Sequence, residues 1–176
     1  MTSPWLVLVT GPPGTGKSTL AEHAADALDA TVLGWDWVMA GLSTYGAVQE
    51  ALRGMSQVEH RGVGWSVMLS LATAQLRCGR SVVLDGVARD AEVAAVRSLP
   101  GARALVVVTS CGDLAVHRSR VEGRVRNIPG WYELDWVEVE RVLKAWQPPA
   151  GADLELDAAN SLDANLGLLA ALLPDS

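Results

Sequence analysis

Short apolar runs alternate with amphipathic stretches along most of the chain. The first run, residues 5–10, reads WLVLVT and predicts a strand that is buried on both faces. Further runs predict strands at residues 31–34, 81–85, 104–109 and 153–157, of which the last alternates like an edge strand. This alternation of strands with helices predicts a parallel sheet covered by helices on both faces.

Helical spacing fills the stretches between these strands. The expected helices cover residues 17–28, 44–53, 64–77, 89–99, 113–124, 135–146 and 162–173. Asp36 follows the second strand at a position that can begin a further helical segment. No repeat, low-complexity tract or linker interrupts the pattern, so residues 1–176 are expected to form a single domain.

A glycine-rich loop follows the first strand directly. Residues 11–18 read GPPGTGKS and match the phosphate-binding pattern G-x-x-x-x-G-K-[ST]. Glycines allow successive backbone N–H groups to converge on phosphate oxygens, and the next helix points the positive end of its dipole at the same anion. We expect Lys17 to reach the β- and γ-phosphates and the Ser18 hydroxyl to bind Mg²⁺. The residues expected to contact the nucleotide are Gly11, Pro12, Pro13, Gly14, Thr15, Gly16, Lys17, Ser18 and Thr19.

Composition narrows the class of protein. The formal net charge of −6 argues against a general electrostatic grip on nucleic acid, although local basic patches remain possible. Cys78 and Cys111 are isolated and lack metal-binding spacing, as in a reduced cytoplasmic protein. No apolar run approaches the ~20 residues of a membrane helix, so a soluble protein is expected. The chain has seven Trp and no Phe, and some of these indoles are expected to line a ligand pocket.

Beyond the loop, several features occur in the order found in a group of small kinases. They are the loop at residues 11–18, Asp36 after the second strand, Asp85 at the end of the third, and the Arg120–Arg124 pair. Together they resemble the small P-loop kinases that include polynucleotide kinase, chloramphenicol phosphotransferase and the zeta toxins. The resemblance implies a three-layer α/β P-loop fold, with a five-stranded parallel sheet in the order 2-3-1-4-5 and a short helical lid over about residues 118–146. Residues 128–133, IPGWYE, also resemble a lid segment of bacterial AAA-domain ATP-binding proteins.

In that kinase group, the Asp after the second strand accepts a proton from the attacking hydroxyl, and Asp36 matches this position. A carboxylate at a strand end beside the phosphate loop can orient and deprotonate an acceptor. The alternative is that Asp36 only caps a helix. Trp35 and Trp37 flank it and are expected either to form an apolar wall for the acceptor or to belong to the core. In a helix they splay by roughly 200°, so at least one would point away.

Two further candidates follow the third strand. Asp85 is expected to hold Mg²⁺ through water or, alternatively, to position the acceptor. A role is favoured because a buried acid at a strand end is costly unless it has partners. Arg89 is expected either to contact substrate or phosphate, or simply to face Asp85 or solvent.

Residues 117–126 contain four arginines. Arg120 and Arg124 share a face at helical spacing, and the resemblance implies that one contacts the nucleotide and the other the transferring phosphate. The alternative is a solvated helix face. His117 is expected at the surface, without a role. Trp131, beyond the break in the helix, is expected either to close over the acceptor or to fasten the lid to the body.

The only lysines are Lys17 and Lys144, so the guanine-specifying Asn-Lys-x-Asp motif is absent. We therefore expect an ATP- and Mg²⁺-dependent kinase that transfers the γ-phosphate to a hydroxyl of a small molecule, either a metabolite or an antibiotic-like compound. The first alternative is a nucleoside or polynucleotide 5′-hydroxyl kinase. Polynucleotide kinase carries an Arg three residues after its Asp, where this chain has Met39, so nucleic acid is not favoured. The second alternative is a nucleotide-binding regulatory protein without kinase activity.

Overall fold

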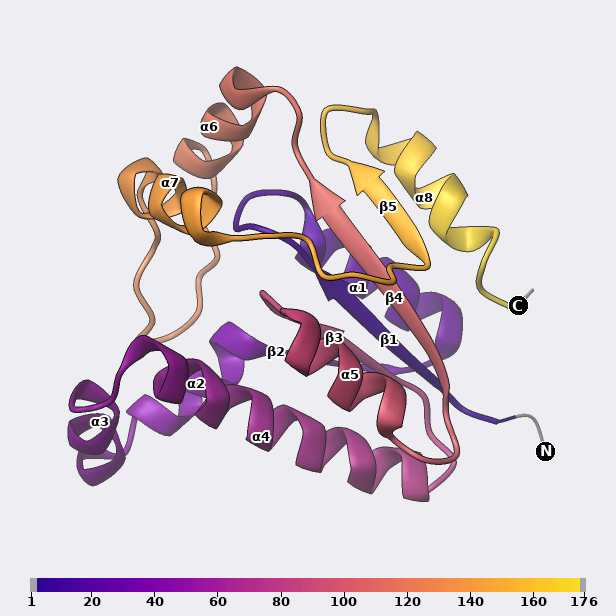
Figure 1. Ribbon diagram of the computed structural model, residues 1–176, viewed down its shortest axis with the longest axis horizontal. Helices are drawn as coiled ribbons and strands as arrows, with labels where there is room; N and C mark the ends of the chain where they lie inside the picture. The colour runs from indigo at the N-terminus through magenta and orange to yellow at the C-terminus, as the bar shows by residue number, and fades with distance from the viewer. Residues whose placement is uncertain (1–2, 175–176) are drawn as a thin grey trace.

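A parallel sheet forms the centre of the molecule in a computed structural model that describes residues 3–174 (Figure 1). Its strands are β1 (Trp5–Thr10), β2 (Thr31–Gly34), β3 (Val82–Asp85), β4 (Arg103–Ser110) and β5 (Leu154–Asp157). They lie in the order β2-β3-β1-β4-β5, and every neighbouring pair is parallel. The expected sheet, with its strand order, is confirmed.

Helices cover both faces of the sheet. The helices of the described residues are α1 (Lys17–Leu28), α2 (Trp35–Ser43), α3 (Gly46–Arg53), α4 (Gln57–Arg77), α5 (Asp90–Ser98), α6 (Leu114–Glu122), α7 (Trp136–Ala145) and α8 (Leu162–Ala170). The helices α4 and α5 pack on one face, and α1 and α8 pack on the other. Of the helices within residues 3–174, none has the length and apolar character needed to cross a membrane.

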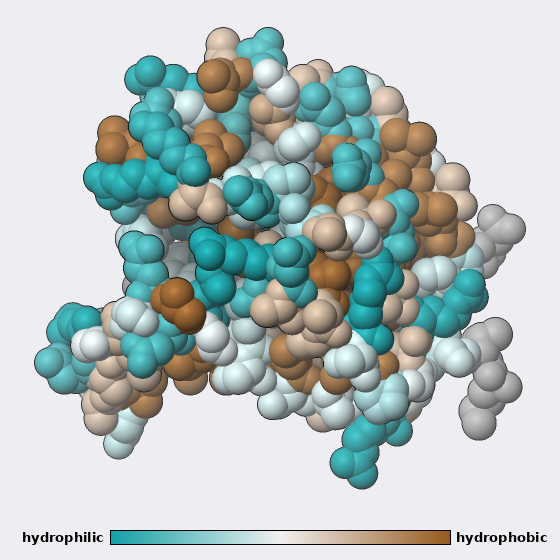
Figure 2. All heavy atoms as spheres, viewed as in Figure 1, coloured by the Kyte–Doolittle hydropathy of each residue, from teal (hydrophilic) through white to brown (hydrophobic). Residues whose placement is uncertain are grey.

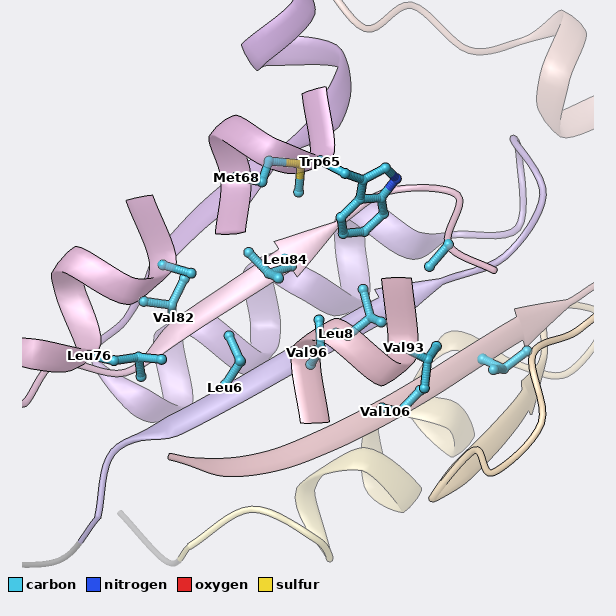
Figure 3. Close-up of a cluster of buried hydrophobic side chains, with 13 residues drawn as sticks. Leu6, Leu8, Trp65, Met68, Leu76, Val82, Leu84, Val93, Val96 and Val106 are labelled. Carbon is cyan, nitrogen blue, oxygen red and sulfur yellow. The ribbon is translucent and has the colours of Figure 1, made fainter. Parts of the chain in front are cut away.

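The central strand β1 divides the core into two layers. Successive side chains of a strand point to opposite faces, so Leu6 and Leu8 pack towards α4 and α5, whereas Val7 and Val9 pack towards α1 and α8. Figure 3 shows the first layer, in which Leu6 and Leu8 lie among side chains of β3, α4 and α5. Because all four β1 side chains are fully buried, the strand holds the loop that follows it on a rigid base.

Two helix boundaries differ from the sequence prediction in ways that matter for the site. The helix α4 begins at Gln57 rather than Gly64, because Ser56 and Glu59 form a capping box ahead of a polar first turn. The helix α6 ends at Glu122 rather than near Arg124, so Arg124 lies in the segment that follows the helix. The apolar periodicity alone did not reveal either end.

The chain between α6 and α7 has no helix or strand and makes a long excursion. It leaves α6, runs along the carboxyl ends of the strands to α2, and returns to α7 (Figure 1). The space-filling view shows a recess between the part of the molecule formed by α6 and α7 and the part formed by α2 and α3 (Figure 2). We call residues 123–135 the crossing segment; it borders this recess.

Candidate active site

The phosphate loop connects β1 to α1 and has the backbone that its glycines were expected to provide. Gly14 has φ +85°, and a Cβ at this position would lie 2.5 Å from Val121 Cγ2 on α6, so glycine is required for two reasons. Thr15 Oγ1 donates to the Pro12 carbonyl at 2.8 Å, and Lys17 Nζ donates to the same oxygen at 2.9 Å. These bonds engage the Pro12 carbonyl oxygen, whose partial negative charge would otherwise repel a bound phosphate.

Ser18 and Asp85 meet beside the loop. Ser18 Oγ donates to Asp85 Oδ2 at 2.7 Å, which joins the start of α1 to the end of β3. Burial raises the pKa of Asp85, and the Lys17 ammonium and the Ser18 hydroxyl oppose that rise. A carboxylate and a hydroxyl in contact suit the oxygen preference of Mg²⁺. Among residues 3–174 there is no group of three or more His, Cys, Asp or Glu that could hold a metal by itself.

A cavity of about 280 Å³ opens beside the loop. Its lining residues are Gly14, Thr15, Gly16, Lys17, Ser18, Thr19, Leu20, Arg120, Arg124, Ala158, Asn160, Leu162 and Asn165. The structure therefore brings Arg120 and Arg124 to the same cavity as the phosphate loop, although only Arg120 lies within a helix. Burial lowers the pKa of Arg124, as does the charge of Arg126, and the Asp36 carboxylate opposes this effect.

The far wall of this cavity comes from the β5–α8 connection, which the sequence analysis did not identify. Ala158 and Asn160 follow β5, and Leu162 and Asn165 belong to α8. A general signal existed, because ligands of open α/β sheets bind outside the carboxyl ends of the strands, and β5 ends at this edge. A cavity lined by both the phosphate loop and this connection is suited to the phosphates of a nucleotide.

Asp36 lies in the first turn of α2, and Gly34 occupies the N-cap position. Helix capping is therefore not the role of Asp36. Its Oδ2 accepts from Arg126 Nη1 at 2.6 Å, and its Oδ1 accepts from Trp131 Nε1 at 3.1 Å. Both carboxylate oxygens are thus oriented by the crossing segment, and each keeps a lone pair for a further hydrogen bond.

Arg126 was not among the predicted site residues, although it lies in the arginine-rich stretch that drew attention. Its side chain is only 10% exposed. Its Nε donates to Glu133 Oε2 at 3.0 Å, its backbone N–H donates to Glu133 Oε1 at 2.8 Å, and its Nη2 donates to the Tyr132 carbonyl. These three bonds hold the Arg126 side chain in the position from which it donates to Asp36. Its spacing from Asp36 in the chain carried no signal of this contact.

The two tryptophans beside Asp36 separate, as helical geometry requires. Trp35 points inward, where its Nε1 donates to the Arg61 carbonyl at 3.1 Å and its ring meets Trp131 edge-on at 6.2 Å. Trp37 is 58% exposed and turns away from this group.

Trp35 and Trp131 have two further aromatic neighbours. The ring centroid of His60 lies 5.7 Å from that of Trp35, and the ring centroid of Tyr132 lies 5.0 Å from that of Trp131. We call Trp35, His60, Trp131 and Tyr132 the aromatic cluster.

Arg89 lies at the N-cap of α5, exposed to solvent. Its backbone N–H donates to Glu92 Oε2 at 2.8 Å, and the other Glu92 oxygen pairs with Arg61 Nε at 3.2 Å. Within the part of the chain that the structure describes, no salt bridge involves the Arg89 guanidinium. Of the alternatives for Arg89, the pairing with Asp85 is not formed and the residue is exposed to solvent, while contact with substrate or phosphate stays a prediction.

His117 is buried, contrary to the prediction from the sequence. It was expected at the surface, but it is only 1% exposed, and its Nε2 lies 2.7 Å from the Pro13 carbonyl of the phosphate loop. The surrounding stretch is rich in charge, which made a solvated residue the default interpretation. The burial arises because α6 packs against the loop at Gly14, a contact that no local pattern records.

The phosphate loop and Asp36 belong to one electrostatic unit. Burial lowers the pKa of Lys17, and the negative charges of Asp85 and Asp36 oppose that change. Asp36 is thus close enough for its charge to act on the lysine expected at the β- and γ-phosphates. Arg120 and Arg124 line the cavity beside the loop, and the Asp36 carboxylate lies within electrostatic range of Lys17. Phosphoryl transfer uses groups of these kinds, namely cations on the phosphates and a carboxylate for the acceptor.

The five-stranded parallel sheet, with the phosphate loop at its carboxyl edge, defines a P-loop α/β fold. The chain belongs to the AAA domain family AAA_33, whose model matches residues 6–149. The matched region includes the phosphate loop, Asp36, Asp85 and the crossing segment.

Solved structures of kinases share the fold over nearly their whole length. A sugar kinase from Janibacter sp. HTCC2649 aligns with a TM-score of 0.71 at 16% identity, covering 96% of this chain and 93% of its own. A gluconokinase from Sinorhizobium meliloti 1021 aligns with a TM-score of 0.68 at 18% identity, covering 98% and 95%. The Mycobacterium tuberculosis APS kinase in complex with AMPPNP and APS aligns with a TM-score of 0.66 at 22% identity, covering 98% of each chain.

A comparison with curated proteins gave no match. At 16–22% identity, the structural neighbours establish the shared fold and leave the acceptor open.

Proposed function

We propose that this protein transfers the γ-phosphate of ATP to a hydroxyl group of a small molecule. One observation carries the proposal: Asp36 is oriented at both oxygens, by Arg126 and Trp131, within electrostatic range of Lys17. These contacts fix the direction of a carboxylate whose oxygens keep acceptor capacity for a further hydrogen bond. The kinase neighbours are consistent with this chemistry but do not identify the acceptor.

The nucleotide half of the mechanism uses the loop and the residues around it. Lys17 and the loop N–H groups hold the β- and γ-phosphates, and Arg120 and Arg124 neutralise the charge that develops during transfer. Ser18 and Asp85 would hold Mg²⁺, which would supply positive charge to offset that of the phosphates.

The acceptor half uses Asp36 as the base. It accepts the proton of the acceptor hydroxyl while the acceptor oxygen forms a bond to the γ-phosphorus, and the bond between that phosphorus and the bridging oxygen breaks to release ADP. Arg126 and Trp131 keep the carboxylate oriented during this step. We also propose that residues 118–146 act as the lid, and that the protein belongs with the polynucleotide kinase, chloramphenicol phosphotransferase and zeta toxin group.

The surroundings of Asp36 favour an uncharged, ring-bearing acceptor. The aromatic cluster supplies flat apolar surface next to the base. Two nearby guanidiniums are already paired, Arg126 with Asp36 and Glu133 and Arg61 with Glu92, and the third, Arg124, is assigned here to the phosphates. An acidic acceptor would meet the carboxylates of Asp36 and Glu133 without a free cation from this group to offset them.

The test compares wild-type protein with Asp36→Asn, and with Asp26→Asn as a matched control on the exposed side of α1. Transfer from γ-labelled ATP is measured to pairs of ring-bearing alcohols, such as a phenyl glucoside with its glucuronide and a nucleoside with its monophosphate. We expect Asp36→Asn to lose about 10²- to 10⁴-fold in transfer while its affinity for ATP is retained.

Within each pair, the neutral compound should be the better acceptor. Survival of transfer in Asp36→Asn would contradict the role of the base. A better reaction with the acidic member would overturn the assignment of an uncharged acceptor while leaving the kinase activity intact. A wild-type protein that binds ATP and phosphorylates no hydroxyl would instead favour a regulatory nucleotide-binding protein.

A further inference from the structure

His117 is a buried ionisable side chain with no part in the proposed mechanism. It is 1% exposed, and it lies on α6, far along the chain from the phosphate loop. Its Nε2 is 2.7 Å from the Pro13 oxygen. Since a carbonyl only accepts, Nε2 carries the proton and donates it. The other ring nitrogen, Nδ1, is buried without a hydrogen-bond partner, so the ring is held by the single bond to the loop.

The hydrogen bond from His117 matters because a phosphate loop must keep its carbonyl oxygens away from the bound phosphates. Its N–H groups can face phosphate oxygens only if the carbonyls between them point elsewhere. The Pro12 carbonyl is held by Thr15 and Lys17, and the Pro13 carbonyl is held by His117. The first carbonyl is thus held from within the loop, whereas the second depends on a side chain from α6.

Packing supports the same contact from both sides. On the loop side, Gly14 leaves just enough room for α6, since an added Cβ would lie 2.5 Å from Val121 Cγ2 and 3.1 Å from His117 Nε2. On the other side, Trp136 of α7 meets the His117 ring edge-on at 5.4 Å. The imidazole is therefore fixed between the phosphate loop and α7.

The same helix carries one of the cavity arginines. Arg120 lies on α6 one turn beyond His117, and the chain continues from α6 to Arg124, which lines the same cavity. A bond between His117 and the loop therefore fixes the distance between the N–H groups that hold phosphate and the guanidiniums that neutralise it.

We infer that His117 is a positioning residue of the phosphate site, which holds the Pro13 carbonyl away from the phosphates and keeps α6 in register with the loop. It thereby contributes to affinity for the triphosphate. This role concerns nucleotide binding alone, so it holds whatever the acceptor is. A failure of the inference can be told apart from a failure of the proposed kinase activity, because its test contains no acceptor.

The test measures the Kd of magnesium AMPPNP and, separately, of adenosine. His117→Phe keeps a ring against Trp136 but loses the donor, whereas His117→Gln places an amide N–H where Nε2 was. We expect His117→Phe to weaken AMPPNP binding about tenfold, because a buried carbonyl is left without its donor. Adenosine, which lacks the phosphates, should bind as it does to wild type. His117→Gln should restore most of the AMPPNP affinity.

Matched controls separate this role from general stability. His23→Phe changes an exposed histidine on α1 and should have no effect on either ligand. If His117→Phe does not fold, the comparison of His117→Gln with His117→Asn replaces it, because the shorter amide stops one carbon short of the Pro13 carbonyl. The inference is overturned if the donor-free variant binds AMPPNP like wild type, if adenosine is weakened equally, or if Gln and Asn behave alike.

Discussion

The proposed nucleotide half and the proposed acceptor half of the site are built in different ways. Residues 11–19 of the nucleotide half come from one loop and the helix that follows it. The acceptor half joins Asp36 on α2 to Arg126, 90 positions away in the chain, and to Trp131, 95 positions away. A site formed by consecutive residues can be recognised in the sequence as a motif. A site that is completed by a segment distant in the chain can be recognised only in the folded structure.

The two halves also differ in how firmly they are held. Thr15 of the phosphate loop is buried and bonds to Pro12 and to Thr109 of β4. In the acceptor half, the Arg126 side chain is only 10% exposed, but the side chains of its partners Asp36 and Glu133 are 40% and 42% exposed. Salt weakens ion pairs whose groups are exposed to solvent. We therefore expect the acceptor half to open more readily than the loop.

The largest effect should come from Lys17→Met, which damages the nucleotide half. Removing its charge from the β- and γ-phosphates should lower kcat/KM for transfer about 10²- to 10³-fold and weaken ATP binding as well. Lys144→Met, at the only other lysine, is the control and should leave both unchanged. Steady-state kinetics with an ATP titration measures the effect. Normal ATP affinity in Lys17→Met would break the assignment of this half.

The counterpart in the acceptor half is Arg126→Gln. Loss of a charge-assisted bond to Asp36 should lower kcat about 10- to 100-fold with little change in ATP affinity. Arg126→Lys should recover only part of the rate, because one ammonium cannot reproduce the planar fork that contacts Asp36 and Glu133 together. Arg118→Gln removes an exposed pair with Glu122 and serves as the control. A parallel loss of ATP affinity would show that the halves are not separable.

A smaller and more selective effect is expected from Gly64→Ala on α4. A Cβ there would collide with the Trp35 indole, whose own Cβ lies close to Gly86. The overpacking should lower the free energy of unfolding by about 1–3 kcal/mol and raise KM for the acceptor. Gly62→Ala, on the same helix with no atom within 4 Å of the added Cβ, should be neutral or stabilising. Thermal unfolding and acceptor kinetics test the pair, and equal effects would contradict the prediction.

The smallest effect should come from Trp131→Phe. A smaller aromatic ring stays in the aromatic cluster, while the Nε1 donor to Asp36 is lost together with the second ring of the indole. We expect kcat to fall about fivefold, as for the loss of one ordinary hydrogen bond. Trp37→Phe, at the 58% exposed neighbour of Asp36, should leave kcat unchanged. A larger effect at Trp37 would move the acceptor to the other side of α2.

Much of the fold could be predicted because its signals are local. The strand at residues 5–10 and the strand at residues 31–34 lie where the apolar runs placed them, and α1 begins at Lys17 as expected. The start of α4 was missed because its first turn is polar and is set by the Ser56–Glu59 capping box rather than by apolar spacing. The order of motifs along the chain predicted Asp36, Asp85 and the Arg120–Arg124 pair as site residues, and their roles remain predictions.

The acceptor half and the role of His117 could not have been predicted in the same way. Of the four arginines in residues 117–126, spacing favoured Arg120 and Arg124, but the crossing segment brings Arg126 to Asp36. Spacing alone also cannot say which tryptophan beside Asp36 turns inward, since this depends on Gly64 and Gly86 leaving room for Trp35.

By itself, the sequence determined a parallel α/β sheet and a glycine-rich loop with the phosphate-binding pattern, because strand burial and glycine backbone geometry act between near neighbours in the chain. Only the tertiary structure decided which side chains orient Asp36, what closes the far side of the nucleotide cavity and why His117 is buried. These contacts depend on the path of the crossing segment and on the packing of α6 against the loop, which bring together residues that are distant in the chain.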